Sequence, residues 1–67
     1  MRIVLNNRDD TFEFDELTIS RIIELKKYTF PRVVTKLNGK LIKKPEYPTT
    51  IVKDGDKLEI IHLISGG

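Results

Sequence analysis

The chain has 67 residues, one histidine, and no cysteine or tryptophan. A chain of this length folds as one domain with a small core, and it has little room for a deep pocket that excludes water. These features argue against a self-contained enzyme, a disulfide scaffold, a thiolate metal site and a cysteine nucleophile. Hydrophobic residues make up 39% of the chain and charged residues 33%, which is typical of a folded, soluble protein.

Twelve basic and ten acidic residues give a formal net charge of +2. The basic residues are scattered, with only the doublets Lys26-Lys27 and Lys43-Lys44, whereas a nucleic-acid-binding surface usually gathers them on one face. No apolar run approaches the roughly 20 residues that cross a membrane. The start, residues 1–5, is too short for a signal peptide, and charged residues follow at once. We therefore expect a cytoplasmic protein that binds neither nucleic acid nor membrane.

The first residues predict a β-hairpin. Residues 2–5 are rich in strand-forming side chains, and residues 11–14 alternate aromatic and polar side chains. The polar stretch between them, residues 6–10, then forms the hairpin loop. Phe12 and Phe14 would share one face of the second strand, so we expect both in the core.

A single amphipathic helix follows. Thr18 is a candidate N-cap, because its hydroxyl can accept a hydrogen bond from a free N–H of the first turn. Ile19, Ile22 and Ile23 have the spacing of one apolar helix face. The proline of residues 30–31 cannot continue a helix, so the segment ends there.

The second half predicts three more strands. Asn38-Gly39 is the strongest turn signal, because a two-residue hairpin turn needs positive φ at both positions. Two prolines make residues 43–50 an irregular crossover with one tight helical turn, and residues 54–56 form a further turn. The strands that these signals separate are residues 33–37, 40–42 and 57–63.

The order of the elements predicts an α+β domain. The helix lies between two hairpins, so it must cross one face of a single sheet, and the last strand returns to the middle parallel to the first. This is the ubiquitin-like β-grasp plan, with a mixed five-stranded sheet packed on one main helix. We expect it to span residues 1–63 and to be followed by a flexible tail, residues 64–67.

The sequence closes with Gly66-Gly67. Two glycines can be no more than a frayed end. Without Cβ atoms, however, glycine can thread a slot that any side chain would block, and four extended residues reach about 13–14 Å. That reach could bring the carboxylate of Gly67 into a partner's active site, where transfer of AMP from ATP would make it an electrophile.

These features together resemble the ThiS family, the sulfur carriers of thiamine biosynthesis. The resemblance covers essentially the whole chain. The residues that carry it are Leu37-Asn38-Gly39 followed by Ile42, Asp54-Gly55-Asp56 before the last strand, and Gly66-Gly67. The related MoaD family, the small subunit of molybdopterin synthase, shares the fold and the two glycines but is usually longer and often has prolines before its tail.

The resemblance implies a co-substrate rather than an enzyme, and one that binds no cofactor or metal itself. A ThiF-like activating enzyme would use ATP to adenylate the Gly67 carboxylate, and sulfur supplied by a cysteine desulfurase would convert it to a thiocarboxylate. A ThiG-like thiazole synthase would then take the sulfur. Ile64, Ser65 and Gly66 would be recognised as the tail, and the free carrier would be a monomer.

An apolar patch should accompany the tail. If Ile60 faces the core, strand alternation leaves Ile61 and Leu63 facing outward. Leu41 joins them if Ile42 points inward. We expect these three outward residues to form a partner-docking surface, although a bulge could turn Ile61 or Leu63 into the core, or they could be scattered surface residues.

Other functions stay open. The chain could be a MoaD-like sulfur donor for molybdopterin or another pathway, a β-grasp module that binds RNA or protein, or a modifier joined to lysines. The sequence offers no second histidine and no cysteine to act with His62 in catalysis, so His62 is expected to be a plain strand residue. Tyr28, Phe30 and Tyr47 could stack on bases, but core or rim packing is the simpler interpretation.

Overall fold

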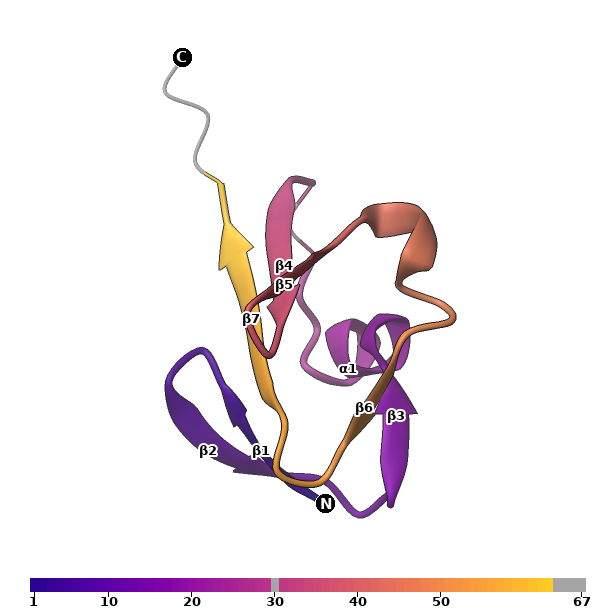
Figure 1. Cartoon of the computed structure of the whole chain (residues 1–67). Coiled ribbons are helices and arrows are strands. Elements are labelled where there is room, and N and C mark those ends of the chain that lie inside the picture. Colours follow the sequence, from indigo (N-terminus) through magenta and orange to yellow (C-terminus); the bar gives the residue numbers. More distant parts are fainter. Residues whose placement is uncertain (30, 64–67) are drawn as a thin grey trace.

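The structure, a computed structural model of the chain, describes residues 1–29 and 31–63. Five strands form a mixed sheet in the order β2-β1-β7-β4-β5, and the helix lies with a second, two-stranded sheet on one side of it (Figure 1). The central strand β7 runs parallel to β1 and antiparallel to β4. The elements are β1 (Arg2–Leu5), β2 (Arg8–Thr11), β3 (Glu16–Thr18), α1 (Ile19–Leu25), β4 (Val33–Leu37), β5 (Lys40–Ile42), the 3-10 helix η1 (Lys44–Glu46), β6 (Ile51–Lys53) and β7 (Lys57–His62).

The predicted β-grasp arrangement is therefore confirmed, including the central position of the last strand. The crossover contains the expected tight helical turn, η1. Asn38 and Gly39 have φ angles of 52° and 85°, as the predicted hairpin turn requires. No helix in the described part of the chain is long and apolar enough to cross a membrane.

The predicted hairpin loop of residues 6–10 is wrong. Leu5 pairs directly with Arg8, so the turn contains only Asn6 and Asn7, with φ angles of 51° and 67°. Asparagine tolerates this left-handed backbone well, and such a turn matches the twist of the strands. The strand Arg8–Thr11 has no apolar residue and is mostly exposed at the sheet edge, so hydrophobic alternation could not reveal it.

The predicted strand over residues 11–14 is also wrong. The sheet ends at Thr11, and the amino group of Met1 donates hydrogen bonds to the carbonyl oxygens of Phe12 and Phe14, at 2.7 and 2.8 Å. Phe12 packs against the core, whereas Phe14 is 47% exposed. The rings do not share a buried face, because the backbone that carries them is outside the strand ladder.

A second sheet, formed by β3 and β6, was not predicted. Leu17 of β3 lies opposite Val52 of β6, and both are buried. Each strand has three residues, which is too short for an alternating pattern to be recognised. The helix begins where β3 ends, and the Thr18 hydroxyl accepts a hydrogen bond from the N–H of Arg21 at 3.1 Å, which confirms the N-cap.

The core lies between the helix and the inner face of the large sheet. Thr35 is buried among apolar side chains, and its hydroxyl donates a 2.7 Å hydrogen bond to the hydroxyl of Tyr47. This bond connects the crossover to the sheet. Tyr47 is buried in the core, in agreement with the core or rim packing predicted for it. The buried hydrophobic residues are Ile3, Leu5, Leu17, Ile19, Ile22, Ile42, Tyr47, Val52, Leu58 and Ile60.

Two turn asparagines hold the backbone of β7. The side-chain amide of Asn6 accepts from the N–H of Ile60 at 2.8 Å and donates to its carbonyl oxygen at 3.2 Å. At the other end of the strand, the side chain of Asn38 accepts from the N–H of Lys57 at 2.8 Å. Asn6 thereby supplies hydrogen bonds to β7 where β1 has already ended.

We expect Asn6→Gly to lower the free energy of unfolding by about 1–3 kcal/mol, because the backbone groups of Ile60 lose their partners. Asn7→Gly is the matched control. Asn7 has the same left-handed φ, so glycine relieves strain there and should leave stability unchanged or raise it by up to about 1 kcal/mol. Urea unfolding of both variants measures the difference, and equal effects would show that the Asn6 side chain contributes nothing.

Candidate functional site

The site is the end of β7, because the residues predicted to act follow it or lie beside it. The four predicted tail residues, Ile64, Ser65, Gly66 and Gly67, lie outside the described residues, as does Phe30. β4 pairs with β7 from Leu58 to His62, past the point where β1 ends. The ladder then continues to a 3.1 Å hydrogen bond from the N–H of Leu63 to the carbonyl oxygen of Arg32. The chain thus leaves the sheet from a fixed position.

The outward-facing apolar residues are placed as predicted. Leu41, Ile61 and Leu63 are 55%, 49% and 46% exposed, whereas their neighbours Ile42 and Ile60 are buried. No bulge turns Ile61 or Leu63 into the core. The predicted alternation of buried and outward-facing side chains therefore holds through Ile61, after which His62 and Leu63 are both exposed.

Val34 belongs to the same surface and was missed in the sequence. It lies directly opposite Ile61, and Leu41 lies opposite the next outward position of β4, Lys36. Val33 and Val34 are the same residue type, so only the pairing with β7 shows which of them faces outward. We call the surface formed by Val34, Leu41, Ile61 and Leu63 the outer patch.

Charged residues border the outer patch. Lys36 is opposite Glu59 on β7, and Glu59 forms a 3.7 Å ion pair with Lys57. Exposed pairs of this kind contribute little to stability because water screens them. Their effect on the patch is to surround its apolar residues with a polar rim, as is usual at protein–protein contacts.

The other polar residues singled out in the sequence have structural roles. Asp54 accepts from the N–H of Arg2 at 2.7 Å, and Asp56 accepts from the N–H of Lys53 at 2.9 Å, so both carboxylates support a turn, as predicted. His62 is an exposed residue of β7. Among residues 1–29 and 31–63, no group of three or more His, Cys, Asp and Glu side chains is arranged to hold a metal ion.

In the described part of the chain, Lys26 is the group whose pKa is clearly shifted. The ammonium group of Lys26 donates a 2.6 Å hydrogen bond to Asp10, and this bond raises the pKa of Lys26 above its ordinary value. The pair joins the edge strand β2 to the C-terminal end of α1. This ion pair connects two elements and lies away from the end of β7.

Comparisons with known proteins agree with this geometry. A family model described as the ThiS family matches residues 3–67. The chain belongs to the ThiS family. The crystal structure of a thiamine biosynthesis protein (ThiS) from Geobacter metallireducens is similar to it, with a TM-score of 0.89, 26% sequence identity and 100% coverage of both chains.

An NMR solution structure of a thiamine biosynthesis protein from the same organism has a TM-score of 0.80 and 26% identity, and the match covers 100% of this chain and 88% of that one. The search of curated protein sequences found no significant match. The family match includes the end of the chain beyond Leu63. The resemblance inferred from the two turns and the closing glycines is thus confirmed at the level of the family.

The two faces of β7 predict losses of stability of different size when a side chain is truncated. Ile60→Ala should lower the free energy of unfolding by about 2–5 kcal/mol, because it leaves a cavity in the core. Ile61→Ala should lower it by less than about 1 kcal/mol, because that side chain is half exposed. Thermal unfolding monitored by circular dichroism measures both, and an equal loss in the two variants would contradict the assigned faces.

Proposed function

We propose that the chain is a sulfur carrier of thiamine biosynthesis and that the carboxylate of Gly67 carries the sulfur. The observation that supports this most strongly is the match of the ThiS family model to residues 3–67, which includes both closing glycines. The likeness of the whole chain to a solved thiamine biosynthesis protein (ThiS) supports the same pathway.

The chemistry starts from an unreactive carboxylate. One oxygen of the Gly67 carboxylate attacks the α-phosphorus of ATP on an activating enzyme, a P–O bond forms, and pyrophosphate leaves. The product is an acyl adenylate, whose AMP is a good leaving group. Hydrosulfide then attacks the acyl carbon, the bond to the AMP oxygen breaks, and a thiocarboxylate, AMP and a proton result. A thiazole synthase takes the sulfur from this thiocarboxylate.

The composition of the chain suits a carrier of this kind. There is no cysteine, so no side-chain thiol can hold the sulfur, which supports a carboxylate as the reactive group. The catalytic groups belong to the partners, which are a ThiF-like activating enzyme and a ThiG-like thiazole synthase, with a cysteine desulfurase as the source of sulfur. The carrier acts as a co-substrate and is a monomer between encounters.

The outer patch is the docking surface in this proposal. Ile61 and Leu63 belong to the segment that leads to the tail, so a partner that covers them also receives Gly66 and Gly67. Leu41 and Val34 extend the apolar area across β4 and β5. Exposed apolar area of this kind is buried on association, which supplies affinity, while the polar rim keeps the free protein in solution.

Intact mass spectrometry tests the carrier chemistry. After incubation with ATP, a ThiF-like enzyme and sodium sulfide, the chain should gain about 16 Da, because sulfur replaces one carboxyl oxygen. The gain should depend on ATP, and fragmentation should place it on Gly67. A variant that lacks Gly67 is the matched control and should stay unmodified although it remains folded. Modification of the shortened chain, or none of the full chain, would contradict the proposal.

A second pair of variants tests the outer patch. Ile61→Asp puts a charge in the patch and should slow thiocarboxylate formation by about tenfold or more at low carrier concentration. Ile51→Asp is the matched control, since Ile51 is 38% exposed on β6, outside the patch. Equal rates in the two variants would show that docking uses another surface.

Whether the sulfur passes to a thiazole synthase or to a molybdopterin synthase distinguishes the ThiS-like from the MoaD-like role.

A further inference from the structure

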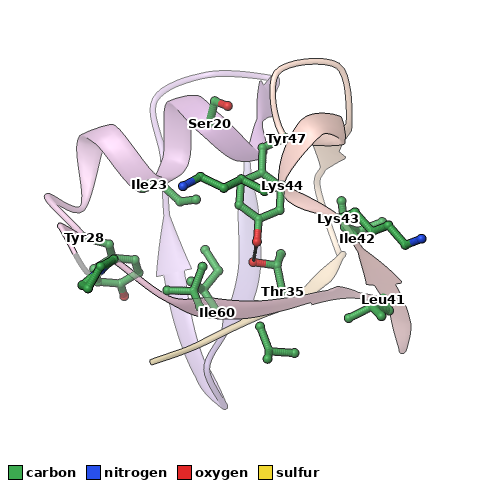
Figure 2. A pocket seen from close by; sticks show the side chains of 13 residues that line it. Ser20, Ile23, Tyr28, Thr35, Leu41, Ile42, Lys43, Lys44, Tyr47 and Ile60 are labelled. Atoms are coloured by element: carbon green, nitrogen blue, oxygen red, sulfur yellow. Dashed lines mark hydrogen bonds between the residues drawn. The ribbon is translucent and has the colours of Figure 1, made fainter. Parts of the chain in front are cut away.

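A pocket of about 420 Å³ lies between α1 and the first half of β4, and it shares only Val34 and Leu41 with the outer patch. Ile23, Tyr28 and Val33 line it with half-buried apolar side chains, which pack against the core from its edge. Figure 2 shows Tyr28 and Lys43 on opposite sides of the pocket. The residues that close it on the core side are Ile42, Tyr47 and Ile60.

An open sheet edge borders this pocket. The carbonyl oxygen of Arg32 accepts from the N–H of Leu63, directly after β7. Because the direction of backbone hydrogen bonding alternates along a strand, the N–H and C=O groups of Val33 and Thr35 point toward the opposite edge. At that edge, Thr35 pairs with Ile42 of β5. Because β5 ends at Ile42, no strand of the described residues lies opposite Val33. The N–H and C=O of Val33 can therefore pair with an added strand.

The rim of the pocket is basic. Lys43 and Lys44 both line it, and neither forms an ion pair within residues 1–29 and 31–63. Residues 25–45 contain no acidic residue at all. Glu46 is the next carboxylate along the chain, and it already accepts a 3.0 Å hydrogen bond from the N–H of Lys43. The charge at this edge therefore favours an acidic occupant.

We propose that this edge binds an extended acidic segment of a partner protein. The segment adds to β4 beside Val33, places one apolar side chain in the pocket, and sets its flanking carboxylates next to Lys43 and Lys44. Strand addition fixes direction and register, while the pocket and the lysines supply affinity and selectivity. Val33 lies opposite His62 at the end of β7, so the bound segment would lie at the same end of the sheet as the residues that lead to the tail.

The test uses the full chain and a fluorescent eight-residue peptide that has four apolar residues between two acidic pairs. We expect binding in the micromolar range that weakens with salt, and loss of binding when lysines replace the acidic residues of the peptide. On titration, the amide of Val33 should shift in ¹⁵N NMR spectra and become protected from hydrogen exchange. A chain that does not bind the peptide would overturn the proposal.

Val33→Pro tests strand addition most directly. Val33 donates its N–H to no strand within residues 1–29 and 31–63, so proline removes the donor without breaking the ladder. It should lower the affinity for the peptide by about tenfold or more, whereas Val33→Thr, which keeps the N–H, should lower that affinity much less. Equal affinities of the two variants would exclude strand addition and overturn the proposal.

A charge variant keeps the test decisive if Val33→Pro does not fold. The double variant Lys43→Glu with Lys44→Glu should lower the affinity for the peptide by about tenfold or more. The control, Arg8→Glu with Lys53→Glu, makes an equal change of charge on exposed residues elsewhere and should keep the affinity. Equal losses in the two double variants would indicate attraction by net charge alone. Displacement of the peptide by an RNA of similar charge would show an unspecific anion surface, and either result would overturn the proposal.

Discussion

The placement of β7 between β1 and β4 is the constraint on which the rest of the structure depends. A strand that is both last in the chain and central in the sheet needs hydrogen-bonding partners on each side. β4 supplies one side from Leu58 to His62, and Asn38 pairs with Lys57 at the start of the strand. On the other side β1 is too short, and the side chain of Asn6 takes over at Ile60. The position of the chain end and of the outer patch follows from this arrangement.

The alternation of side chains along β4 and β7 places the two proposed recognition surfaces on different sides of a very small protein. Val34 and Ile61 face outward in the outer patch, whereas Val33 and Ile60 contribute to the pocket beside the helix. A partner could therefore contact the carrier on both sides of the same strand end. In the proposed function the body presents and orients the terminal carboxylate, and the partners supply the catalytic groups, so the carrier needs no enclosed catalytic site.

The errors in the sequence analysis share a physical cause. Hydrophobic alternation reveals a strand only where one of its faces is buried, and the edge strand β2 has little to bury. The bonds from the amino group of Met1 then determine where Phe12 and Phe14 lie, through contacts between residues more than ten positions apart. The short strands β3 and β6 pair across more than 30 residues. No local pattern encodes pairing at that distance.

The sequence by itself determined the capped helix, the Asn38-Gly39 hairpin, the alternation of the last strand and the family resemblance of the closing glycines, because each depends on local backbone preference or on side-chain spacing. Only the tertiary structure decided which of Val33 and Val34 faces outward, how Asn6 completes β7, and where β4 is left without a neighbour. Those features depend on strand register, which is set by the packing of distant segments against one core.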